Sequence, residues 1–137
     1  MDRPLPVPNA DTAPFWDGCA AGVVTVQRCE ACGATQFPPR PFCTSCRSNR
    51  LTWGPTSGRA TVASFTVVHR APVPAFREAV PYVLALVDLP EGPRLMTNVV
   101  DCDPQDVRIG QAVRFVFRRV ADGAPPLPCC VPDPEVA

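Results

Sequence analysis

Four cysteines in two CxxC pairs carry the clearest chemistry in this 137-residue chain. The pairs are Cys29-Glu-Ala-Cys32 and Cys43-Thr-Ser-Cys46, close together in the sequence. Each CxxC turn directs two thiolates at one ion, at about 2.3 Å for zinc, and Gly33 directly after the first pair suits the tight turn needed there. The spacing therefore predicts a tetrahedral zinc site with Cys29, Cys32, Cys43 and Cys46 as ligands.

Such a site is structural rather than catalytic, because four protein ligands leave no open position for water or substrate. Iron is the alternative metal, since a rubredoxin site also uses four thiolates. An iron protein would be red, whereas a zinc protein is colourless. The sequence alone leaves this choice open.

The segment around the cysteines, residues 23–56, has the order of a zinc ribbon: strand, metal turn, link, metal turn and strand. The link over residues 36–42 holds too many prolines for a helix. So few apolar side chains cannot stabilise a module of this size, so we expect metal binding to supply the missing folding free energy.

Residues 1–22 are expected to form a proline-rich, extended and mobile arm followed by a short docking helix. Asp11 or Thr12 can cap this helix, and Pro14 suits its first turn. Phe15, Trp16 and Cys19 form its apolar side.

Residues 57–132 change to alternating, β-branched segments separated by turn residues, which predicts a β-barrel. One short helix is expected between the third and fourth strands, over residues 103–110, where Asp, Pro and Gly stand at cap positions. Five strands with one helix in this place have the order of an OB-fold, and residues 133–137 remain as a tail. The predicted strands are 59–69, 82–89, 94–101, 112–120 and 127–131.

Composition limits the possible partners. The chain has 13 basic and 13 acidic residues, and every basic residue is arginine. Zero net charge gives no overall attraction for nucleic acid or an anionic membrane. With no signal-like or membrane-spanning apolar run, we expect a cytoplasmic protein that binds no membrane. Cys19, Cys102, Cys129 and Cys130 show no disulfide spacing and are expected to be free thiols.

Several strings resemble a known family: bacterial and archaeal zinc-ribbon plus OB-fold proteins associated with acyl-CoA metabolism. The similarity covers roughly residues 14–132. The strings are Pro14-Phe15-Trp16, Gln27-Arg28-Cys29-x-x-Cys32-Gly33, Phe37-Pro38-Pro39-Arg40-Pro41-x-Cys43-x-x-Cys46, Gly58-Arg59-Ala60-Thr61, Phe65-Thr66-Val67-Val68-His69-Arg70, Val80-Pro81-Tyr82 and Ile109-Gly110-x-x-Val113.

The resemblance implies a non-catalytic accessory subunit. Members of this family assemble with a thiolase or a thiolase-like aldolase of sterol side-chain breakdown. The implied role is to stabilise that enzyme in a hetero-oligomer and to help form its acyl-CoA site. This chain departs from the family at Leu127-Pro128-Cys129-Cys130, where an aromatic residue often follows Leu-Pro.

Six residues outside the metal site are candidates for contact with a CoA thioester or a partner. His69, the only histidine, ends the core-facing row of its strand; a strand-end histidine bound to a backbone carbonyl is the simpler interpretation. The arginines suit phosphate, although a strand's arginine row is usually a solvated face. The loop after the first barrel strand is a common ligand contact in OB-folds, and equally a plain exposed loop. The candidates are His69, Arg70, Phe76, Arg77, Arg114 and Arg118.

The alternative function is a single-stranded nucleic-acid-binding module, since zinc ribbons and OB barrels both serve that role elsewhere. Zero net charge, no lysine and no evident stacking pair argue against it. An independent enzyme is also disfavoured, because the sequence shows no nucleophile and base pair and no open metal site.

Overall fold

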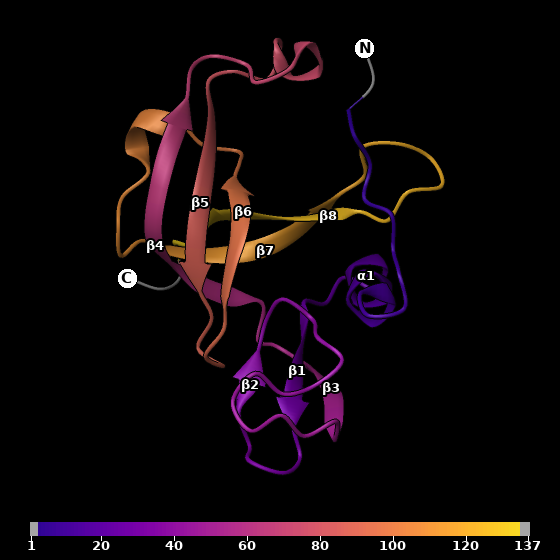
Figure 1. The fold of residues 1–137 in the computed structure, drawn as a ribbon. Coiled ribbons are helices and arrows are strands. Elements are labelled where there is room, and N and C mark those ends of the chain that lie inside the picture. The colour runs from indigo at the N-terminus through magenta and orange to yellow at the C-terminus, as the bar shows by residue number, and fades with distance from the viewer. Residues whose placement is uncertain (1–2, 135–137) are drawn as a thin grey trace.

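The computed structural model describes residues 3–134, which form a small three-stranded sheet, one helix and a barrel (Figure 1). The ends of the predicted arm and tail, residues 1–2 and 135–137, lie outside the described residues. The helix is α1 (Ala13–Ala20), and the ribbon strands are β1 (Thr25–Cys29), β2 (Thr35–Gln36) and β3 (Leu51–Pro55). The barrel strands are β4 (Arg59–Val68), β5 (Tyr82–Asp88), β6 (Arg94–Val99), β7 (Ala112–Arg118) and β8 (Leu127–Pro132).

The predicted docking helix is present as α1, with Phe15 and Cys19 buried. Thr12 stands at the N-cap position, as predicted, but its side chain makes no capping hydrogen bond. Asn9 orders the approach instead, because its Oδ1 accepts hydrogen bonds from the backbone N–H groups of Asp11 (2.9 Å) and Thr12 (3.0 Å). A side chain outside the helix therefore fixes how the arm enters it.

The ribbon sheet has the order β2-β1-β3, and both pairings are antiparallel. Its central strand pairs with β3 over its full length, from Thr25 opposite Pro55 to Cys29 opposite Leu51. The first metal turn follows directly from this strand. The sheet thus fixes where Cys29 stands.

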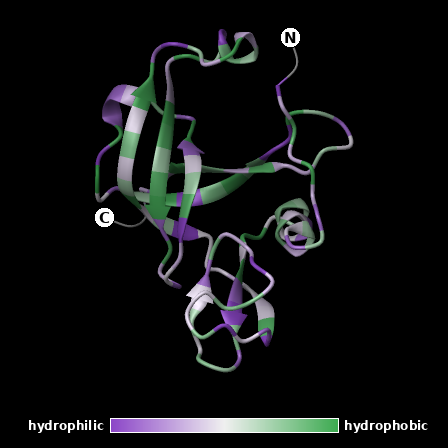
Figure 2. Ribbon diagram, viewed as in Figure 1, coloured by the Kyte–Doolittle hydropathy of each residue, from purple (hydrophilic) through white to green (hydrophobic). Residues whose placement is uncertain are grey.

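The barrel is closed in the order β4-β5-β6-β8-β7, which confirms the five-stranded OB-fold. Inward residues alternate along β5: Val83, Ala85 and Val87 are almost fully buried, and β5 is hydrophobic over nearly all its length (Figure 2). A bulge in β4 between Val62 and Ser64 shifts the register. Such bulges bend a strand as a closed barrel requires.

The helix predicted over residues 103–110 is a single 3-10 turn, Pro104–Asp106. Asp103 caps it as expected, accepting a hydrogen bond from the Gln105 N–H at 2.9 Å. A second 3-10 turn, Pro74–Phe76, lies in the loop after β4. None of the helices in residues 3–134 is long and apolar enough to span a membrane.

Helix, ribbon and barrel share one continuous hydrophobic core. The Phe15 ring lies 5.0 Å from the ring of Phe37 in the ribbon's proline-rich link. Glu91, in the turn between β5 and β6, accepts hydrogen bonds from the Thr35 hydroxyl on its backbone oxygen (2.8 Å) and from the Ser57 N–H on its carboxylate (3.0 Å). The ribbon is therefore held to the barrel by both apolar and polar contacts.

Replacing Phe15 by alanine is expected to lower the free energy of unfolding by about 3 kcal/mol, because a buried aromatic ring at the junction of helix and ribbon is lost. The measurement is urea denaturation of the zinc-loaded chain. Phe42→Ala is the matched control: Phe42 is 50% exposed, and its loss is expected to change stability by less than about 0.5 kcal/mol. Equal losses in the two variants would contradict the shared core.

Candidate metal centre and partner surface

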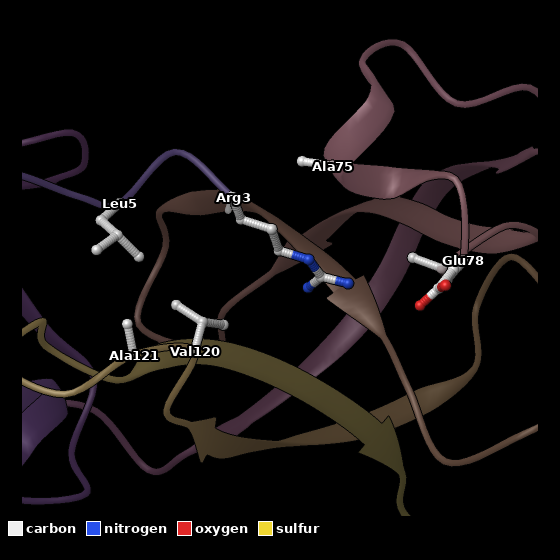
Figure 3. A pocket seen from close by; sticks show the side chains of 7 residues that line it. Arg3, Leu5, Ala75, Glu78, Val120 and Ala121 are labelled. Atoms are coloured by element: carbon white, nitrogen blue, oxygen red, sulfur yellow. The ribbon is translucent and has the colours of Figure 1, made fainter. Parts of the chain in front are cut away.

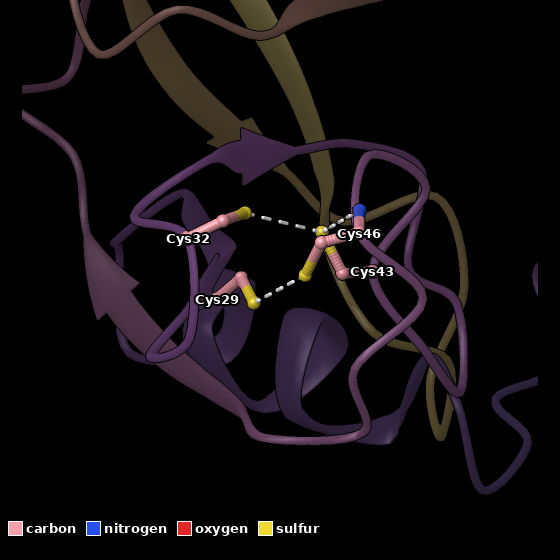
Figure 4. Close-up of side chains that lie close together, drawn as sticks. All are labelled: Cys29, Cys32, Cys43 and Cys46. Carbon is pink, nitrogen blue, oxygen red and sulfur yellow. Dashed lines mark hydrogen bonds between the residues drawn. The ribbon is translucent and has the colours of Figure 1, made fainter.

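The two CxxC turns are built alike and face each other, so their four side chains converge (Figure 4). In each turn the residue after the second cysteine donates its N–H to the carbonyl of the first: Gly33 to Cys29 at 2.8 Å, and Arg47 to Cys43 at 2.9 Å. Both residues have positive φ, 77° for Gly33 and 65° for Arg47. The second turn thus adopts the left-handed conformation without a glycine, which is unusual.

The sulfur positions fit one tetrahedral ion. A Zn–S bond of about 2.3 Å puts neighbouring sulfurs of a tetrahedron about 3.8 Å apart. The Cys29 and Cys46 Sγ atoms lie 3.6 Å apart, and those of Cys32 and Cys43 lie 3.7 Å apart. All four sulfurs lie within 4.8 Å of one another. The residues therefore fit a closed four-thiolate site, where zinc supplies a crosslink and no open position for a substrate.

Backbone N–H groups prepare two of the thiols as ligands. The Cys46 and Ser45 N–H groups point at the Cys43 sulfur and lower the pKa of this thiol to about 6, and the Cys32 N–H lowers the pKa of Cys29. Cys46 differs: the Ser48 N–H lowers its pKa, but the Cys29, Cys32 and Cys43 thiols around it and desolvation raise it to about 12. Four thiolates repel one another, so a divalent cation is needed to hold all four together.

Two buried glutamines fix the second turn relative to the first. Gln27 accepts the Arg40 N–H (2.9 Å) and donates to the Arg40 carbonyl (2.9 Å), while Gln36 accepts the Thr44 N–H (3.0 Å). The Gln36 side chain also donates to the Gln27 side chain at 2.8 Å. This network was not predicted from the sequence. Its signal was a pair of polar residues at strand positions that face the ribbon's interior, where a buried amide needs hydrogen-bond partners.

An apolar groove lies where α1, the ribbon and the barrel meet. It encloses about 350 Å³ and is lined by Trp16, Phe37, Met96 and Pro128, among others. Strands β6 and β8 form only one register pair, Val99 with Cys130, and the Thr97 hydroxyl bonds the Pro128 carbonyl at 2.9 Å. Proline has no N–H to extend the ladder, so the strands diverge and leave the groove.

Three of the six predicted contact residues lie after the end of β4. His69 and Arg70 are exposed beyond the end of β4, and Arg77 is exposed in the following loop. Within residues 3–134 the His69 side chain has no hydrogen bond, so the expected backbone-carbonyl partner is wrong. No nucleophile or base among the described residues is hydrogen-bonded to the imidazole, as a catalytic pair would require.

The other three predicted residues lie on the barrel. Arg114 is exposed on β7, with Arg59 as its cross-strand neighbour. Arg118, at the end of β7, forms an ion pair with Asp101. Phe76 and Arg118 line one cavity at the end of the barrel, so the structure brings together only two of the six.

Cys19, Cys102, Cys129 and Cys130 form no disulfide, as expected. Cys129 and Cys130 are both buried, and burial raises the pKa of the Cys130 thiol to about 12. These two residues pack as small apolar side chains in β8 rather than as reactive groups.

Comparison with known proteins agrees with this architecture. Residues 16–52 match the family described as ChsH2, rubredoxin-like zinc ribbon domain, and residues 53–118 match ChsH2, C-terminal OB-fold domain. A DUF35 domain-containing scaffold protein of Methanocaldococcus jannaschii is 41% identical over 76% of this chain and 71% of its own length. A probable enoyl-CoA hydratase alpha subunit of Thermomonospora curvata is 40% identical over 81% of this chain, which spans only 34% of that protein.

A solved structure is similar over nearly the whole fold. It is a chain of the Ltp2-ChsH2(DUF35) aldolase, with a TM-score of 0.83 and 35% identity over 93% of this chain and 98% of that one. The similarity thus includes the helix, the ribbon and the barrel together.

Removing the metal is expected to unfold the ribbon, because the glutamine hydrogen bonds and the few apolar side chains of this small module cannot replace the folding free energy that metal binding supplies. Metal analysis of the purified, colourless chain should find about one zinc per molecule, and a strong chelator should lower the melting temperature. Cys43→Ser should lose the metal, whereas Cys102→Ser, a thiol outside the cluster, should keep it. A chain that keeps its melting temperature without metal would contradict a structural site.

Proposed function

Since the chain belongs to the ChsH2/DUF35 family of zinc-ribbon and OB-fold proteins, we propose that it is a non-catalytic subunit of an acyl-CoA enzyme. In this proposal it assembles with a thiolase-like aldolase, stabilises it and helps form its acyl-CoA site. The observation that carries the proposal is the similarity to the DUF35 chain of the Ltp2-ChsH2 aldolase over helix, ribbon and barrel alike.

The geometry of the chain supports a scaffold role. Its metal is enclosed by four thiolates, and its only histidine stands alone and exposed at a strand end. Neither group offers a nucleophile beside a base, nor an open metal position. The chemistry of the complex therefore belongs to the partner subunit.

The apolar groove between α1, the ribbon and the barrel is the proposed docking face for that partner. Met96 is 67% exposed there, beside the partly buried Trp16 and Phe37. Exposed apolar surface of this kind marks an interaction site more often than a plain surface. Here the helix and ribbon supply much of the contact, and the zinc keeps Phe37 in place through the turns on either side.

The exposed arginines are the proposed contact for CoA phosphates or an acidic partner surface. Arg114 and Arg59 stand opposite each other on neighbouring strands, so two guanidinium groups share one stretch of the barrel. A single guanidinium can bind two phosphate oxygens at once through parallel N–H donors. His69, Arg70 and Arg77 form a second exposed basic segment, in the loop between β4 and β5.

Met96→Asp is expected to weaken the complex at least tenfold, because it places a charge in an apolar contact. The measurement is co-elution of the zinc-loaded chain with a thiolase-like aldolase from the same cell, followed by the carbon–carbon cleavage activity of the mixture. Ile109→Asp is the control: Ile109 is 71% exposed and outside the groove, and its variant should assemble normally. If neither variant differs from the native chain, the groove is not the docking face.

The proposal as a whole fails if the native chain and aldolase elute separately and no activity is gained. A steep loss of oligonucleotide affinity with salt would instead favour the nucleic-acid-binding function.

A further inference from the structure

A second cavity, separate from the metal centre, lies at one end of the barrel. It encloses about 270 Å³ where the loop after β4, the end of β7 and the N-terminal arm meet. Most of its wall is apolar, from Val99, Val100, Val120 and Leu127. A space with such walls favours an aliphatic or aromatic body.

One side of this barrel-end cavity is aromatic. The rings of Phe76 and Tyr82 lie 6.0 Å apart at an angle of 43°, and both line the cavity. Phe76 is held in the 3-10 turn Pro74–Phe76, and Tyr82 begins β5. Two neighbouring elements therefore fix this wall.

Two guanidinium groups stand at the cavity. Arg118 reaches it from the end of β7, and Arg3 lies over the Phe76 ring with 5.0 Å between its Cζ and the ring centroid. Arg118 uses Nη2 for its ion pair with Asp101. A guanidinium has five N–H donors, so this single contact leaves Arg118 able to bind a second carboxylate. Asp101 does not line the cavity, and no carboxylate does.

The N-terminal arm borders the cavity through Arg3. A neighbouring space of about 470 Å³ is lined by Arg3, Leu5, Glu78 and Val120, and shares Arg3 and Val120 with the cavity. Figure 3 shows the Arg3 side chain extending from the arm toward the loop that carries Ala75 and Glu78. The arm thus supplies one of the two positive charges at the cavity.

We propose that the barrel-end cavity binds a small amphipathic carboxylate, with its apolar tail against the aromatic wall and its carboxylate between Arg3 and Arg118. A volume of 270 Å³ equals about nine water molecules at about 30 Å³ each, which suits a ligand of about ten non-hydrogen atoms. Octanoate has this size and charge. The proposal concerns this chain alone and does not depend on an aldolase partner.

The test is calorimetric titration of the zinc-loaded full chain with octanoate, and with octan-1-ol as a neutral ligand of equal length. Octanoate should bind more tightly than octanol. Arg118→Gln should weaken octanoate binding about fivefold and leave octanol unchanged, since one charge-assisted contact at a partly exposed site is lost. Arg3→Gln should act in the same direction.

Arg94→Gln is the matched control, because Arg94 also forms an exposed ion pair, with Asp88, but does not line the cavity. This variant should bind octanoate as the native chain does. Melting curves check that each variant is folded. The proposal is overturned if the native chain does not bind octanoate, if octanol binds equally well, or if the Arg94 and Arg118 variants lose equal affinity.

The same titration separates this proposal from the docking proposal. Met96 does not line the barrel-end cavity, so Met96→Asp should retain octanoate binding even where it loses the partner. A chain that binds octanoate but no aldolase would contradict only the docking proposal. A chain that binds an aldolase but no octanoate would contradict only the proposed carboxylate site.

Discussion

The constraint on which the structure depends is the convergence of four thiols on one point. Two turns that flank the ribbon's proline-rich link bring their sulfurs to 3.6–3.7 Å separations, and four thiolates at such distances need a shared cation because they repel one another. The ribbon's proline-rich link runs between these turns and carries Phe37, against which Phe15 of α1 packs. The metal therefore positions the link, the link positions α1 through Phe37 and Phe15, and these two rings form part of the wall of the apolar groove.

The rest of that groove comes from a defect in the barrel. A complete ladder between β6 and β8 would bring the two strands together, but Pro128 has no N–H and the strands share a single register pair. Closure is achieved at Val99 and Cys130, where the Val100 N–H also bonds the Cys130 carbonyl at 2.8 Å. The two strands are thus paired through their backbones at Val99 and Cys130, whereas at Pro128 the Thr97 hydroxyl joins them.

Much of this fold could be predicted from the sequence, because its signals are local. Paired cysteines identified the metal ligands, and alternation in residues 57–132 identified the barrel. What escaped prediction depends on how the backbone turns at particular positions and on which side chains the fold brings together. Asn9 rather than Thr12 orders the helix start, the segment after Asp103 makes a single 3-10 turn, and Gln27 and Gln36 join the two metal turns. No spacing rule reveals that Phe76 and Arg118 share a cavity while His69 does not, since loop paths decide it.

The groove and the barrel-end cavity both lie at the junction of β6 and β8, which we call the β6–β8 seam. Asn98, Leu127 and Cys129 line both spaces, and the Asn98 amide is fixed by its hydrogen bond to the Val83 carbonyl at 2.9 Å. A protein docked in the groove and a ligand in the cavity would therefore contact the same three residues. If the docked protein changes the packing of these side chains, it changes the free energy of ligand binding. The bound ligand then changes the free energy of protein docking by the same amount, since such coupling is reciprocal. The weakly paired β6–β8 seam is the part of the barrel best able to transmit it, because one register pair resists a small shift far less than a full ladder does.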